Sequence, residues 1–136
     1  MPDLDLIANI HMLNDALNQK LNSNFRNPNI NATNYFYLLK VQDNPGISQK
    51  DFKRIIFVHQ TTITRAINHF EKLGYVITHQ DPGDKRTFHL SLTDNGEKVA
   101  NQIREDLLHT QNILNSSTIK IEMVMDVLEK LREDKN

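Results

Sequence analysis

The spacing of apolar residues changes from a helical to an alternating period in the middle of the chain. Over residues 60–73 apolar side chains recur on one helix face, and Gly74 follows as a helix stop because glycine adopts the left-handed conformation without steric cost. Residues 75–79 favour a strand, residues 80–86 are typical of a turn, and residues 87–92 alternate strictly between polar and apolar. This order predicts a helix followed by a two-stranded hairpin. The apolar helix face consists of Ile63, Ala66, Ile67, Phe70 and Leu73.

A shorter helical pattern precedes this stretch. Ser48 is expected to cap it, with Asp51 at the third helical position, and residues 57–60 leave room only for a tight turn. Three apolar residues are expected to be buried: Phe52, Ile55 and Ile56. Two helices joined by a tight turn, the second with a polar outer face, predict a helix-turn-helix. With the hairpin that follows, the pattern predicts a winged helix-turn-helix with a two-stranded wing, in a mainly α (α+β) fold.

Further helices are expected on both sides of this unit. One covers residues 32–41 with Asn31 as its N-cap. Others cover residues 3–22, residues 94–114 with Thr93 as the N-cap, and residues 118–133. The apolar stripe of residues 3–22 fits either a core or a partner surface. The terminal helices carry more apolar surface than a winged helix of this size needs, which predicts a homodimer. The stripes are Ile7, Ile10, Leu13, Leu17 and Leu21 in the first helix, and Ile121, Val124, Met125, Leu128 and Leu131 in the last.

Four short motifs in the central stretch resemble the MarR family of bacterial winged-helix regulators. They are Thr64-Arg65, Leu73-Gly74-Tyr75-Val76, Asp84-Lys85-Arg86 and Leu92-Thr93-Asp94-Asn95-Gly96. The resemblance implies one MarR-like domain over residues 1–136. Its DNA-binding part would be residues 32–92, and residues 3–22 and 94–133 would build a two-fold dimer.

Composition narrows the functional classes. A chain of 136 residues is long enough for one domain with a real core, and it has no cysteine for a disulfide, a thiolate metal site or a redox switch. No apolar run approaches the length of a membrane span and no signal peptide is evident, so a cytoplasmic protein without membrane contact is expected. Residues 48–92 hold seven Lys or Arg against four Asp or Glu, although the whole chain has a net charge of −1. The positive excess therefore lies where a phosphate backbone would need it.

The expected DNA contacts come from the helix over residues 60–73 and from the wing. Arg65 is suited to reading guanine, and the neighbouring threonines can meet a phosphate or a thymine methyl group. Arg86 is expected in the minor groove, with Lys85 on a phosphate and Asp84 aiming the Arg86 guanidinium through a bidentate ion pair. An ordinary solvated helix face and a charged β-turn are the alternatives. The complete predicted set is Ser48, Gln60, Thr61, Thr62, Thr64, Arg65, His69, Lys72, Asp84, Lys85 and Arg86.

The sequence indicates a small-molecule site less clearly than it indicates DNA contacts. Tyr35, Phe36 and Tyr37 are expected either to pack in the core or to line a pocket, and the family resemblance implies a small aromatic effector bound between the dimerisation helices and the DNA-binding part. Glu105 and Asp106 precede His109 at helical spacing, but a chance polar face explains them better than a metal site. No enzyme motif and no cofactor loop is present in the sequence, so neither catalysis nor a cofactor is expected.

The sequence therefore predicts a homodimeric regulator that binds double-stranded DNA, most simply a repressor on a pseudo-palindromic site. The alternative is a winged-helix protein-interaction module without DNA binding. Such a module would have no reason to keep an exposed helix face bearing Thr61, Thr64, Arg65 and Lys72 beside Arg86.

Overall fold

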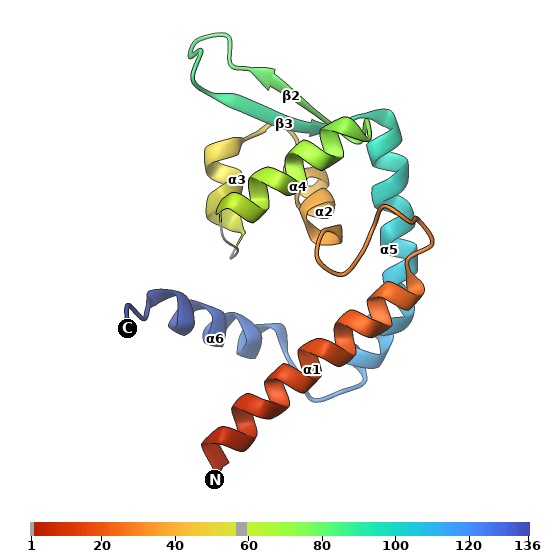
Figure 1. The fold of residues 1–136 in the computed structure, drawn as a ribbon, viewed down its shortest axis with the longest axis vertical. Coiled ribbons are helices and arrows are strands. Elements are labelled where there is room, and N and C mark those ends of the chain that lie inside the picture. The colour runs from red at the N-terminus through yellow and green to blue at the C-terminus, as the bar shows by residue number, and fades with distance from the viewer. Residues whose placement is uncertain (1, 57–59) are drawn as a thin grey trace.

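The fold is mainly helical with a small antiparallel sheet, and the predicted fold class is confirmed. The computed structural model describes residues 2–56 and 60–136 and the side chains of residues 5–56 and 61–136. The predicted tight turn at residues 57–60 lies outside the described residues except for the backbone of Gln60. The helices are α1 (Pro2–Asn24), α2 (Tyr35–Asp43), α3 (Gln49–Ile55), α4 (Gln60–Lys72), α5 (Asp94–Asn115) and α6 (Ile121–Glu133). The strands are β1 (Ile47–Ser48), β2 (Val76–Gln80) and β3 (Phe88–Leu92) (Figure 1).

The sheet has three strands in the order β1-β3-β2, one more than the predicted hairpin. β2 and β3 pair from Val76↔Leu92 to Gln80↔Phe88, and β1 adds Ile47↔Leu90 and Ser48↔His89 on the other edge of β3. A two-residue strand is too short to produce an alternating pattern, so the sequence had no period from which β1 could be predicted. Its effect is to tie the start of α3 directly to the wing.

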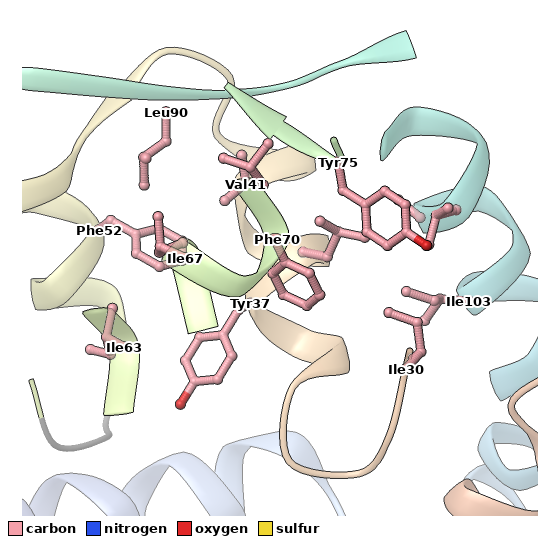
Figure 2. Close-up of a cluster of buried hydrophobic side chains, with 14 of the residues drawn as sticks. Ile30, Tyr37, Val41, Phe52, Ile63, Ile67, Phe70, Tyr75, Leu90 and Ile103 are labelled. Carbon is pink, nitrogen blue, oxygen red and sulfur yellow. The ribbon is translucent and has the colours of Figure 1, made fainter. Parts of the chain in front are cut away.

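The core of the winged helix lies beneath this sheet (Figure 2). In α4, Ile63, Ile67 and Phe70 are almost completely buried, while the opposite face is exposed, as its period predicted. Ile55 was expected to be buried but is 40% exposed. The short helix α3 buries Phe52 and then ends, and Ile56 turns inward from an extended residue beyond it. The other core side chains include Tyr37, Leu38 and Val41 from α2, Leu90 from β3, and Val99, Ala100 and Ile103 from α5.

Predicted caps and stops explain several element boundaries. The Ser48 hydroxyl accepts the Asp51 N–H at 3.1 Å, the Thr93 hydroxyl accepts the Gly96 N–H at 3.0 Å, and Gly74 has φ +77°. The Thr93 hydroxyl also donates to the Gly74 carbonyl at 2.5 Å. A Cβ on Gly96 would collide with the Tyr75 carbonyl, so glycine is required where α5 crosses the link between α4 and β2.

The predicted starts of two helices are wrong by three residues. α2 begins at Tyr35 rather than at residue 32, because Asn31 accepts the Thr33 N–H at 2.9 Å and closes a turn instead of capping a helix. α6 begins at Ile121 rather than at residue 118, because the Ser117 hydroxyl accepts the Ile119 N–H and holds the linker in a turn.

The terminal helices are only partly covered. Leu21 of α1 is buried where α1 packs on α5, but Ile7, Ile10 and Leu13 are each more than half exposed. In α6 only Leu128 is half-buried, and the other apolar side chains are exposed. Figure 1 shows α1 extending away from the winged helix, whereas α6 runs back beneath it, on the side of α2 and α3. Neither these nor any other helix in the described part of the chain combines the length and the apolarity needed to span a membrane.

Candidate nucleic-acid interface

The outer face of α4 presents polar side chains along its whole length. Helical spacing places Thr62, Arg65, His69 and Lys72 along one stripe, with Thr61 and Thr64 adjoining it, and all six are exposed. The predicted side-chain contact of Gln60 lies outside the described residues. Because the apolar face of α4 is anchored in the core, this polar face is held rigidly at the surface of the molecule.

The wing tip is a turn held by two aspartates. Asp81 Oδ2 accepts the backbone N–H groups of Gly83 at 2.8 Å and of Asp84 at 2.9 Å. The Asp84 carboxylate then accepts the Arg86 backbone N–H and the Thr87 hydroxyl, both at 3.0 Å. These bonds shape the backbone under Lys85 and Arg86, whose side chains remain exposed.

The predicted ion pair between Asp84 and the Arg86 guanidinium is therefore wrong. The prediction assumed an extended hairpin arm, in which residues two apart point the same way. The chain instead turns at these residues, with the Thr87 N–H bonded to the Asp84 carbonyl at 3.0 Å. In a turn an aspartate bonds to the backbone two residues on, and Asp84 does so. Asp84 thus orders the backbone of Arg86 and not its side chain.

A basic groove between α3 and the wing was not predicted as a unit. It has a volume of about 550 Å3, and its lining residues are Gln49, Lys50, Lys53, Arg54, Arg86, Thr87 and Phe88. Of the four cations only Arg86 had been singled out. The signal for the others was present, because Lys50, Lys53 and Arg54 have the spacing of one helix face. Arg54 also lies 3.5 Å from Asp51, but both side chains are more than half exposed and this pair is weak.

Ser48 joins this groove to the core of the winged helix. Its hydroxyl oxygen accepts the Asp51 N–H as the cap of α3, which leaves the hydroxyl proton available to a further acceptor. Ser48 also belongs to β1, which pairs with β3 of the wing. The start of α3 and the wing are therefore held in one rigid frame.

The three aromatic rings at the start of α2 contact one another in order but face different parts of the molecule. Tyr37 is 1% exposed and belongs to the core, as the packing alternative required. Tyr35 lines a hollow of about 200 Å3 with Leu17, Leu107 and Leu114, and burial raises the pKa of its phenol. Phe36 lines a different hollow of about 240 Å3, formed with residues of α3 and α6. The three rings therefore do not form one pocket.

The carboxylates considered for a metal site hold an arginine. Arg26 Nε lies 2.6 Å from Asp106 Oδ1, and its Nη2 lies 3.0 Å from Glu105 Oε2. The hydrogen bond to Asp106, followed by that to Glu105, raises the pKa of Arg26. The contact fastens the loop after α1 to α5, which is a structural role.

Comparison with known proteins identifies this architecture. Residues 30–88, which contain α2, β1, α3, α4 and most of the hairpin, match the model of the MarR family. An uncharacterized HTH-type transcriptional regulator, YybA of Bacillus subtilis (strain 168), is 28% identical over 132 residues, 96% of this chain and 88% of the relative. Over residues 30–88 the chain is therefore similar to the MarR family, as the four sequence motifs implied.

Solved structures of transcription regulators share the fold over nearly the whole chain. A mutant MarR from E. coli, complexed with operator DNA, aligns with a TM-score of 0.77 and 22% identity over 96% of this chain and 95% of that one. The PcaV regulator from Streptomyces coelicolor, in complex with its natural ligand, aligns with a TM-score of 0.76 and 18% identity. The alignment covers 93% of this chain and 91% of PcaV. At these identities the similarity establishes the fold, including the helices outside the matched family region.

Proposed function

We propose that this protein is a sequence-specific DNA-binding transcription regulator of the MarR family. The observation that carries the proposal is that three features occur together. They are the exposed polar face of α4, the groove between α3 and the wing with its four cations, and the wing tip, where Asp84 and Lys85 are also exposed. The E. coli relative that shares the fold was solved with operator DNA, which supports the proposal.

In the proposed complex α4 enters the major groove. Arg65 reads a base edge there, because an arginine can donate two hydrogen bonds to guanine. Arg86 approaches the flanking minor groove from the wing, with Lys85 on the backbone. Lys50, Lys53 and Arg54 contact phosphates between these two elements, so they contribute affinity without sequence information.

We further propose a homodimer built from residues 3–22 and 94–133, with residues 32–92 as the DNA-binding part. The support is the uncovered apolar surface of α1 and α6. In α6, for example, Ile121 is 72% exposed and Leu131 is 69% exposed. A two-fold dimer presents one α4 per protomer, and the half-sites should be about 10 bp apart, centre to centre. The target is then a pseudo-palindrome, and repression by blocking a promoter is the simplest outcome. A protein acting on chromosomal DNA is proposed to be cytoplasmic.

A small aromatic effector is proposed to modulate DNA binding. The hollow beside Tyr35 lies between α1, α2 and α5, where the proposed dimer helices meet the DNA-binding part. The PcaV relative was solved with its natural ligand, which supports ligand response in this fold. The alternative of a protein-interaction module is not favoured, because it would not explain the exposed Arg65 or the clustering of Lys50, Lys53 and Arg54 beside Arg86.

The test is binding to the DNA upstream of the protein's own gene, measured by fluorescence anisotropy and footprinting. Arg65→Ala should cost about 1–3 kcal/mol of binding free energy with the fold intact, since Arg65 lies on the exposed face of α4. Lys20→Ala is the matched control, because Lys20 is an exposed cation on α1 away from the proposed interface. Equal affinities of the parent and Arg65→Ala proteins would remove Arg65 from the interface. A footprint on a single half-site would contradict the dimeric reading of the target.

A further inference from the structure

We propose that His89, as an imidazolium, is a positioning residue that locks the wing for DNA binding and makes that binding weaken as the pH rises. The inference rests on the proposed DNA-binding function. It concerns a residue of β3 that does not itself belong to the polar face of α4 or to the basic groove.

Both ring nitrogens of His89 face hydrogen-bond acceptors. Nδ1 lies 2.8 Å from the Gly46 carbonyl oxygen, and Nε2 lies 2.8 Å from Asp81 Oδ1. A carbonyl cannot donate, and an ionised carboxylate cannot either. A neutral imidazole carries one N–H and could satisfy only one of these partners, whereas the imidazolium satisfies both. The side chain of His89 is 25% exposed and that of Asp81 is 32% exposed, so the bridge is partly shielded from water.

The bridge connects the helix-turn-helix to the wing tip. Gly46 lies immediately before β1 and α3, and its N–H bonds to the Leu90 carbonyl at 2.9 Å. Asp81 begins the wing turn, and its second oxygen accepts the N–H groups of Gly83 and Asp84. Asp84 in turn accepts the N–H of Arg86. A series of hydrogen bonds therefore runs from Gly46, the residue before β1, through His89 and Asp81 to the backbone of the proposed minor-groove residue Arg86.

Only one other titratable side chain among the described residues faces His89 besides Asp81. His79 is its cross-strand partner in β2, with ring centroids 5.8 Å apart and planes within 24°. On the β1 side the cross-strand partner is Ser48, which is uncharged. Side chains alternate along β3, so Phe88 and Leu90 point to the face of the sheet opposite to His89. The cations of α3 that line the groove with Phe88 therefore lie on the other side of the sheet from His89. A charge on His79 would oppose a charge on His89, so His79 must be varied separately.

The electrostatics agree with the geometry. The hydrogen bond to Asp81, followed by that to Gly46, raises the pKa of His89. The same bond from His89, followed by the Gly83 N–H, lowers the pKa of Asp81. A raised folded-state pKa means that the bridge is complete below the ordinary histidine pKa of about 6.5 and is lost as the pH rises through the folded value. The neutral ring must then leave either Gly46 or Asp81 without a donor.

The first experiment measures DNA affinity from pH 6 to pH 8.5 at constant salt for the parent, His89→Gln and His79→Gln. Glutamine can donate to one of the two acceptors but does not titrate. The parent should bind about threefold to tenfold more tightly than His89→Gln at pH 6, and the two should converge at pH 8.5. His79→Gln should still bind less tightly as the pH rises, with the loss at the same pH as in the parent or higher, because a charge on His79 can only oppose the charge on His89. Parallel profiles for the parent and His89→Gln would overturn the proposal, because other histidines would then cause the pH dependence.

The second experiment needs no DNA. Nitrogen NMR of the imidazole groups in the free protein should find both ring nitrogens of His89 protonated at pH 6, with a pKa above the ordinary histidine value that falls in Asp81→Asn. A His89 that titrates at its ordinary value in a protein that binds DNA would refute the bridge alone. A doubly protonated His89 in a protein that binds no DNA at any pH would refute the proposed function, and the positioning role with it.

Discussion

The winged helix and the terminal helices both carry rows of apolar residues, but they bury them to very different extents. In the winged helix, Ile63, Phe70 and Leu90 are at most 2% exposed. In the terminal helices, Ile10, Ile121 and Leu131 are between 52% and 72% exposed. An apolar stripe therefore specifies which face of a helix seeks cover, but it does not specify whether the cover comes from the same chain. The winged helix covers its apolar face with side chains of the same chain, whereas most apolar side chains of the terminal helices stay exposed and would be covered only in the proposed dimer.

The largest effect is expected at Phe70 of α4, which is completely buried, because this residue tests whether the core stabilises the winged helix. Phe70→Ala should lower the free energy of unfolding by about 3–5 kcal/mol, because it leaves a cavity in the core of the winged helix. Phe88→Ala is the matched control, since Phe88 is 40% exposed on β3 and its loss should cost far less. Urea denaturation of the three proteins measures the difference. Equal losses for both variants would mean that the core of the winged helix is not the main source of its stability.

The terminal helices can be tested through Leu131, which is 69% exposed. Leu131→Asp should weaken the dimer by about tenfold or more, because it places a charge in the proposed apolar contact, while the winged helix stays folded. Sedimentation at several protein concentrations gives the dimer constant, and circular dichroism reports the fold. Glu129→Ala, on the polar side of α6, should leave the dimer unchanged.

Leu128→Asp is a sharper version of the same test. Leu128 is half-buried beside Phe36 and Ile56, so its replacement should weaken the dimer and also lower the stability of the protomer. An intact dimer for both Leu128→Asp and Leu131→Asp would remove α6 from the proposed interface.

The smallest expected effect lies in the wing tip, which is exposed like the terminal helices but is ordered by its own hydrogen bonds. Asp84→Ala should weaken DNA binding by about threefold to tenfold despite the loss of a negative charge, because the turn below Arg86 loses its order. Asp84→Asn keeps an oxygen that can accept the Arg86 N–H and should bind at least as well as the parent. Affinities measured at two salt concentrations separate order from charge. Tighter binding by both variants would show that only the charge of Asp84 matters.

Arg86→Ala provides the reference for this pair. It should weaken binding and reduce the salt slope by about 1, because one cation no longer displaces a counterion from DNA. An unchanged slope would place Arg86 away from the DNA backbone and grooves.

The candidate interface was only partly predictable. The exposed face of α4 followed from its period, since every apolar residue on the other face has a place in the core. The role of Asp84 was misjudged, because a turn and an extended arm can have the same polar sequence. The groove beside α3 was overlooked, because its cations join Arg86 only after β1 pairs with β3. The bridge at His89 had no signal at all, since residues 46, 81 and 89 show no spacing that relates them.

By itself, the sequence determined the order of the helices and the hairpin, the buried face of α4 and the ends set by Ser48, Gly74 and Thr93. These features depend on periodicity, on capping side chains and on backbone preferences within a few residues, which are local properties. Only the tertiary structure decided the third strand, the direction of the Asp84 side chain, the basic groove and the contacts of His89. Each of those depends on groups that are far apart in sequence or on a backbone direction that several sequences allow, so chain folding had to bring the partners together first.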